Sequence, residues 1–199
     1  MHVIFDFDGT LADTFNLGAS LLNSYAEKFG YNKIDFANSR HLSAKELIKL
    51  SGVKFWKIPH LIRFFRKKSA EKASEINIFP EIEDLLKKLK EKNFQLGILT
   101  TNSASTVNTF LTKYNIEHYF SFIKTEVALF GKKRALKRIK RKLNTPIVYV
   151  GDECRDIQAC NACSIKIISV SWGYNSFDVL TENNKGNVAK KPLEILNFL

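Results

Sequence analysis

Hydrophobic residues along this chain occur either in short continuous runs or at helical spacing. A short run bounded by turn residues is typical of a strand buried on both faces of a parallel sheet. Runs of this kind occupy residues 3–7, 95–100, 120–123, 146–151 and 165–170. Helical spacing predicts helices over 80–93, 103–114 and 131–143, a helix just after 152, and a short helix over 192–199. Because the predicted strands and helices alternate along the chain, we expect an α/β fold, a parallel sheet with helices on both faces.

Between residues 14 and 79 the pattern is different, because no strand-like run interrupts it. Helical spacing predicts a first helix over 14–31 and a second over 43–50, and each is followed closely by a glycine that can end it. Pro59 is suited to the first turn of a third helix. This stretch is too long for an ordinary crossover. We therefore expect a small, all-helical unit inserted after the first strand.

The composition is that of a globular protein with one main core. The chain has 199 residues, 45% of them hydrophobic, and a net charge of +11. This charge favours phosphate-bearing partners, but it comes mostly from lysines spread along the whole chain. No apolar run is long enough to span a bilayer, and acidic residues interrupt the first one. We expect a soluble, cytoplasmic protein without a membrane partner.

The three cysteines, Cys154, Cys160 and Cys163, are an odd number in a chain expected to be intracellular. The last two form a CxxC pair, but no second pair completes a zinc site. We expect them to be small side chains that pack a helix against the sheet.

Candidate chemistry begins with Asp6 and Asp8, which lie where the first strand ends and the chain turns at Gly9. The carboxyl edge of an open α/β sheet is where ligands bind. Two carboxylates this close together repel each other and lose hydration unless a cation lies between them. A hard divalent ion with oxygen ligands, most plausibly Mg²⁺, meets both needs.

Three further signals occur later in the chain. Thr100, Thr101 and Asn102 follow a predicted strand and precede a helix, an arrangement suited to phosphate binding. A predicted helix begins at Lys132, and the candidate functional lysine is either Lys132 or its neighbour Lys133. Another apolar strand ends at Gly151-Asp152, and a second acid, Asp156, follows four residues later.

The motif Asp6-Phe7-Asp8-Gly9-Thr10-Leu11, with these three partners in order, resembles the haloacid dehalogenase-like (HAD) superfamily. The similarity spans residues 1 to about 175 and is greatest to the phosphoglycolate phosphatase-like branch. It departs from that branch where a Lys-Pro pair is common, because Lys133 follows Lys132. The resemblance implies a Rossmann-like core formed by residues 1–14 plus 80–199, and a helical cap formed by residues 15–79.

The resemblance also implies a reaction, namely Mg²⁺-dependent hydrolysis of a small phosphorylated metabolite such as phosphoglycolate. Asp6 would attack phosphorus to form an aspartyl-phosphate, and Asp8 would act as general acid and then as general base. The presence of Asp8 favours phosphoryl transfer over dehalogenation. Thr100 and Lys132 would complete the catalytic set by binding phosphate oxygens.

The implied metal site consists of Asp6, the main-chain carbonyl of Asp8, and Asp152. Asp156 is either a ligand, direct or through water, or a group that orients Lys132, and the sequence leaves this open. Thr101 and Asn102 are candidate substrate-binding residues. Arg40, in a polar loop of the helical stretch, is a further candidate because its planar guanidinium suits a carboxylate or second phosphate. The alternative is that Arg40 is a surface residue that pairs with Glu46 or with a helix end.

Two other functions compete with this hypothesis. A sugar phosphomutase of the same fold would share these motifs. A nucleic-acid-binding protein or polynucleotide-end phosphatase could use the basic helix over 132–142, but no aromatic residues interleave that run for base stacking. We expect one functional lysine, a solvated basic face and no nucleic-acid partner. The sequence leaves the oligomeric state open between monomer and dimer.

Overall fold

A computed structural model of the protein describes residues 1–199. Its main sheet has six strands in the order β5-β4-β1-β6-β7-β8, and every neighbouring pair is parallel. The strands are β1 (His2–Phe5), β4 (Gln95–Leu99), β5 (Phe120–Lys124), β6 (Ile147–Gly151), β7 (Lys166–Val170) and β8 (Val188–Ala189). The chain extends the sheet outward from β1 in one direction and then returns to add β6 on its other side. The boundary between β1 and β6 is thus the point where the strand order reverses, and ligands bind at such points.

Helices cover both faces of this sheet, as the sequence predicted. The longer ones are α5 (Ile82–Glu91), α6 (Ala104–Lys113), α7 (Lys132–Leu143), α8 (Cys154–Asn161) and α9 (Phe177–Asn183). Alternate residues of β1 serve the two faces, because side chains alternate along a strand. Val3 and Phe5 pack with α5 and α6, whereas Ile4 packs with α7, α8 and α9. The three cysteines lie free and buried in the second of these cores, as expected.

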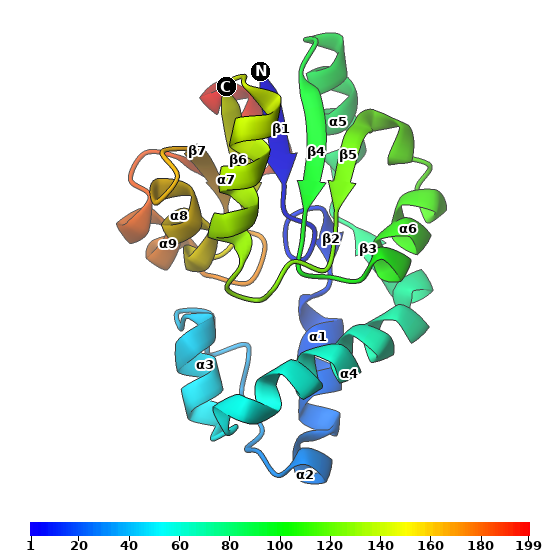
Figure 1. The fold of residues 1–199 in the computed structure, drawn as a ribbon, viewed down its shortest axis with the longest axis vertical. Helices are drawn as coiled ribbons and strands as arrows, with labels where there is room; N and C mark the ends of the chain where they lie inside the picture. The colour runs from blue at the N-terminus through cyan, green and yellow to red at the C-terminus, as the bar shows by residue number, and fades with distance from the viewer.

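A separate group of helices lies beyond the carboxyl ends of the strands, at the bottom of Figure 1, while both chain termini lie at the opposite end. It consists of α1 (Phe15–Ser24), α2 (Ala26–Phe29), α3 (Ala44–Ser51) and α4 (Ile58–Glu71). Local sequence explains its boundaries. Ser43 and Glu46 form a capping box at the start of α3, and Gly52 ends that helix with a φ of 68°.

The chain passes between this helical group and the sheet through a two-stranded antiparallel ribbon. Its strands are β2 (Ala12–Asp13) and β3 (Asn77–Ile78), so the entering and returning segments are hydrogen-bonded side by side. No strand was predicted between residues 14 and 79, and β3 corrects that expectation. Strands of two residues are too short to show a period in sequence.

Other differences from the sequence-based prediction are small. The expected helix over 14–31 is divided at Tyr25 into α1 and α2. The strand β8 and the helix α9 were not predicted, and the final helix is of the 3-10 type. The 3-10 helices are η1 (Phe55–Lys57), η2 (Ala73–Glu75), η3 (Glu117–Tyr119) and η4 (Pro192–Phe198). None of the helices combines the length and the apolar character needed to cross a bilayer.

Candidate active site

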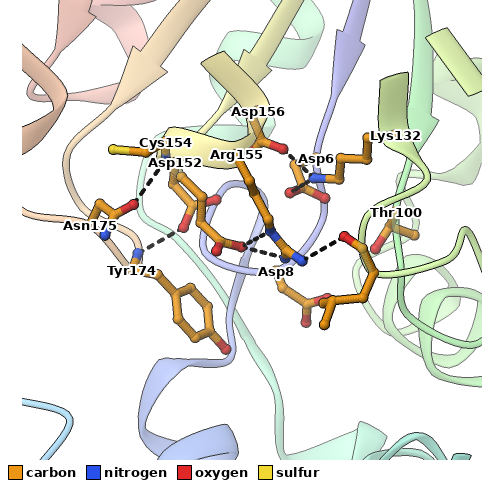
Figure 2. Close-up of polar contacts among 12 residues, drawn as sticks. Asp6, Asp8, Thr100, Lys132, Asp152, Cys154, Arg155, Asp156, Tyr174 and Asn175 are labelled. Carbon is orange, nitrogen blue, oxygen red and sulfur yellow. Dashed lines mark hydrogen bonds and ion pairs between the residues drawn. The ribbon is translucent and has the colours of Figure 1, made fainter. Parts of the chain in front are cut away.

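The register of the sheet brings three sequence-distant residues to one edge. Phe5 pairs with Ile98 on one side and with Val150 on the other. Asp6 follows Phe5 directly, Thr100 lies two residues beyond Ile98, and Asp152 lies two residues beyond Val150. All three side chains therefore emerge at the carboxyl ends of adjacent strands, where Figure 2 shows them close together.

A buried lysine from the start of α7 joins this edge. The Lys132 ammonium forms ion pairs with Oδ2 of Asp6 and with Oδ1 of Asp156, the latter at 2.6 Å. Only 3% of Lys132 is exposed, whereas Lys133 is exposed to solvent. Of the two lysines that the sequence left as alternatives, Lys132 is therefore the one that lies among the carboxylates. The other basic residues of this helix, from Lys133 to Lys142, lie on its exposed face.

Two groups from distant loops hold the Asp152 carboxylate. The Thr10 hydroxyl donates to Oδ1 at 3.0 Å, and the Tyr174 main-chain N–H donates to Oδ2 at 2.7 Å. The backbone approaches this carboxylate so closely that a Cβ atom on Gly9 or Gly173 would overlap it. Only glycine fits at these two positions, and Gly9 also has a φ of 71°, which favours glycine.

The acidic residues suit a hard divalent cation. Ligand oxygens of Asp6, Asp152 and Asp156 all lie within 4.8 Å of one another, and Lys132 forms ion pairs with Asp6 and Asp156. Oδ2 of Asp156 is buried and has no hydrogen-bond partner, so it is free to bind an ion. Burial raises the pKa of Asp6 to about 7 despite Lys132, and burial with neighbouring acids raises the pKa of Asp152 well above its usual value. Both shifts disfavour the ionised carboxylates, which a bound cation would favour.

Asp8 lies outside this group of three carboxylates and has a different hydrogen-bond partner. Its two oxygens accept hydrogen bonds from the side-chain amide of Asn102 at 2.9 and 3.2 Å. Burial nevertheless raises the pKa of Asp8. A carboxyl with a raised pKa, positioned beside the other groups rather than among them, can hold and transfer a proton.

The segment after β4 connects Asp8 to the rest of the site. Thr100 is fully buried, and its hydroxyl accepts a hydrogen bond from the Asn102 main-chain N–H at 3.0 Å. Ser103, one residue later, is the N-cap of α6 and accepts from the Thr106 N–H at 3.2 Å. The expected helix N-terminus is present, and its turn directs Thr101 and Asn102 toward the cleft described next.

A cleft of about 360 Å³ lies between the sheet edge and the helical group. On the sheet side it is lined by Asp8, Thr101, Asn102, Arg155 and Tyr174. On the helix side most of its lining residues are apolar. The cleft therefore gives a ligand access to Asp8 and Asn102 while its other end lies against the helices.

Arg40, the candidate substrate-reading residue of the helical stretch, lies outside the lining of this cleft. Its guanidinium donates to the main-chain carbonyls of Ser171, Gly173 and Tyr174 instead. Nor does it pair with Glu46, whose side chain caps α3 by accepting from the Ser43 N–H. Main-chain carbonyls attract this arginine because the loop after β7 turns three of them toward it, which no sequence pattern shows.

The loop after β7 holds site residues that the sequence analysis missed. Tyr174 binds Asp152 through its N–H, and Asn175 accepts from the Cys154 N–H at 2.9 Å while donating to the carbonyls of Arg40 and Leu42. Arg155, also missed, pairs with Glu153 beside the cleft. The available signal was position, since Trp172-Gly173-Tyr174 follows a strand and so lies at the same sheet edge.

Comparison with known proteins agrees with this geometry. The sequence pattern described as haloacid dehalogenase-like hydrolase matches residues 3–170. A phosphoglycolate phosphatase from Synechococcus elongatus is 30% identical over 179 residues, covering 87% of this chain and 84% of that protein. Pyrophosphatase PpaX from Oceanobacillus iheyensis is 26% identical over 194 residues, covering 89% of this chain and 86% of that protein. The solved structure of a haloacid dehalogenase-like hydrolase from Streptococcus pneumoniae has the same fold, with a TM-score of 0.79 and 23% identity over 99% of this chain and 97% of that one.

Proposed function

Because this chain belongs to the haloacid dehalogenase-like hydrolase family and is a phosphoric monoester hydrolase, we propose that it is a Mg²⁺-dependent phosphatase that works through an aspartyl-phosphate on Asp6. Its substrate is a small phosphorylated metabolite, of the kind on which the phosphoglycolate phosphatase relative is named to act. One observation carries the proposal: Asp6 and Asp156 share a buried lysine, and Asp152 lies within 4.8 Å of both, beside a cleft that contains Asp8.

Asp6 is the proposed nucleophile because it lies at the centre of this arrangement. A carboxylate oxygen of Asp6 forms a bond to phosphorus as the bond between phosphorus and the ester oxygen breaks. Asp8 gives its proton to that departing oxygen. It then takes a proton from water as the water attacks phosphorus and releases Asp6 and inorganic phosphate. The raised pKa of Asp8 supports this role, because the acid must be protonated when the first step begins.

Lys132 and the segment after β4 are proposed to hold the phosphate. The Lys132 ammonium lies against Asp6, where it would also reach phosphate oxygens and offset their charge. Thr100, Thr101 and Asn102 lie across the site at the start of the α6 segment, and their hydroxyl and N–H groups are suited to phosphate oxygens. Asn102 would also orient Asp8 through the hydrogen bonds described above.

The proposed ligands of Mg²⁺ are Asp6, Asp152 and the main-chain carbonyl of Asp8, together with the free oxygen of Asp156. When bound, the ion supplies positive charge that lets a carboxylate approach an anionic phosphate. Asp156 serves two purposes in this proposal, because Oδ1 orients Lys132 while Oδ2 is left for the ion.

We further propose that residues 15–79 form a cap domain over a core domain made of residues 1–14 plus 80–199. The β2–β3 ribbon is the natural hinge, because both connections between the two domains run through it. A cap that closes would exclude water from the acyl-phosphate, and one that opens would release product.

A phosphate-release assay over a panel of metabolite phosphates, with Mg²⁺ and with a chelator, tests this function. We expect turnover that depends on Mg²⁺ and a covalent phosphate on Asp6 that can be trapped by acid quench. Interconversion of sugar phosphates without net phosphate release would support a phosphomutase instead. Activity restricted to phosphorylated oligonucleotide ends would support the function that uses the basic helix over 132–142.

A further inference from the structure

The cleft has two chemically different ends. Its sheet end carries Asp8, Thr101 and Asn102, the groups proposed to act on or bind the phosphate. Its helix end is mostly apolar, with walls that include Leu22, Leu47, Ile48, Ile62 and Phe65, and 14 of the 23 residues that line the whole cleft are hydrophobic. A bound phosphate ester must therefore direct its organic part toward apolar side chains.

The positive charges of the cleft do not suit an anionic group at the helix end. Its only cationic lining residues are Arg66 and Arg155. Arg155 is already neutralised, because its Nε donates to Glu153 at 2.9 Å, and its Nη1 donates to the Leu129 carbonyl at 3.3 Å. A carboxylate placed among the remaining apolar walls would lose its hydration without gaining a cation.

Arg66 lies close to the sheet end. Its Nη2 donates to the Val127 carbonyl at 3.0 Å, and the Val127 N–H in turn bonds to the Thr100 carbonyl at 3.1 Å. The Nε of Arg66 is buried without an acceptor. The guanidinium charge is therefore held near Thr100, where it favours the phosphate rather than a distant anionic group.

The volume of the cleft points in the same direction. At about 360 Å³ it falls within the range of roughly 300–1,000 Å³ that is typical of sites for organic ligands, which are lined mostly by apolar groups and a few polar ones. A two-carbon acid such as glycolate would leave most of the apolar wall in contact with water. A larger apolar group would displace that water and gain free energy in proportion to the area it covers.

We propose that the preferred substrate is a phosphate monoester whose leaving group has an uncharged, apolar body, alkyl or aryl in character, that fills the helix end of this cleft. The inference rests on the proposed phosphatase function and narrows it. It separates this chain from the phosphoglycolate phosphatase relative, whose named substrate carries a carboxylate next to the phosphate.

A chain-length series on the wild-type protein tests the proposal. The kcat/KM values for ethyl, butyl and hexyl phosphate, and for benzyl phosphate, are compared with the value for 2-phosphoglycolate. We expect kcat/KM to rise about four-fold for each added methylene group until the cleft is filled, and hexyl and benzyl phosphate to exceed 2-phosphoglycolate. Values independent of chain length, or a preference for 2-phosphoglycolate, would overturn the proposal.

Matched variants of α3 show whether the cleft wall causes the preference. Leu47 lines the cleft, whereas Leu50 on the same helix is 53% exposed and does not. Leu47→Asn should lower the ratio of hexyl to ethyl phosphate kcat/KM by about four-fold, the effect of losing one methylene contact. Leu50→Asn should leave that ratio unchanged. An equal ratio in all three proteins would mean that another surface reads the chain.

Arg66→Met tests the alternative that Arg66 binds a substrate carboxylate. If Arg66 reads the phosphate end, its loss should lower kcat/KM for butyl phosphate and 2-phosphoglycolate by a similar factor. A loss confined to 2-phosphoglycolate would assign Arg66 to a carboxylate and overturn the proposal.

Binding of n-alkylphosphonates, measured by calorimetry on wild type with Mg²⁺, tests the cleft independently of turnover. Affinity that increases from ethyl to hexyl supports the inference, and constant affinity contradicts it. If no phosphate ester is hydrolysed, the proposed function fails, and this binding series still decides whether the cleft accepts an apolar chain.

Discussion

The Lys132 ammonium lies 2.6 Å from one oxygen of the buried Asp156 carboxylate, and the other oxygen of that carboxylate has no partner. The two residues are 24 positions apart in the chain and belong to the first turns of α7 and α8. This pair makes Asp156 a link between the proposed phosphate-binding lysine and the proposed metal site.

Lys132→Met is expected to lower kcat by about 100-fold or more, the scale of losing one group that stabilises developing charge. Lys133→Met serves as the matched control, since Lys133 is the exposed neighbour in the same helical turn, and its activity should remain within about two-fold of wild type. Steady-state phosphate release measures both. A larger loss in the Lys133 variant would transfer the role to that lysine.

Asp6→Asn should abolish turnover and acid-stable phosphate labelling while the protein stays folded, because an amide cannot form the acyl-phosphate. The thermal midpoint confirms folding in the same sample. Steady-state phosphate release by pure Asp6→Asn protein would remove Asp6 from the role of nucleophile.

Asp152→Asn should raise the Mg²⁺ concentration needed for half-maximal activity by about ten-fold or more, because the site loses a ligand charge. High Mg²⁺ should recover part of the rate. The exposed Asp178 offers a control, and Asp178→Asn should leave the Mg²⁺ titration unchanged. If Asp152→Asn followed the wild-type titration, Asp152 would not be a metal ligand.

The metal-free protein should lose stability as pH rises from about 4 to about 7. Burial raises the pKa of Asp6 from 3.8 to about 7, so in this window the folded state binds more protons than the unfolded state. The free energy of unfolding then falls with increasing pH. Thermal midpoints with chelator should therefore decrease between pH 5 and pH 7, and less so in Asp6→Asn. Added Mg²⁺ should stabilise more at the higher pH, because it binds the ionised carboxylates. A midpoint difference between wild type and Asp6→Asn that does not change with pH would contradict this linkage.

Arg40→Ala should lower kcat/KM for 2-phosphoglycolate and for p-nitrophenyl phosphate by similar factors and should reduce the thermal midpoint. Arg40 holds carbonyls of residues 171–174, and Tyr174 in that loop binds Asp152, so the effect should reach the site through the loop. Arg63→Ala, at an exposed position of α4, is the control and should change neither quantity. A selective loss of at least about ten-fold on 2-phosphoglycolate alone would restore Arg40 as a substrate-reading residue.

The sequence alone determined five of the six strands of the main sheet, most of the larger helices and the carboxyl edge on which the chemistry lies. These features depend on local pattern: Val3 to Phe5 form a buried run, and Gly9 supplies the turn that ends it. Asp6 and Asp152 could be assigned to one sheet edge because both directly follow such runs, and parallel strands end at the same edge.

Tertiary structure decided which side chains meet. Lys132 and Lys133 are adjacent residues of the same type, and only the packing of α7 against the sheet turns Lys132 inward. Arg40 has no local signal for the carbonyls it binds, because those carbonyls lie more than 130 residues away. The apolar end of the cleft likewise forms only when separate helices pack over the sheet edge. Contacts between distant segments depend on strand register and on the angles at which helices pack, and a local residue pattern specifies neither.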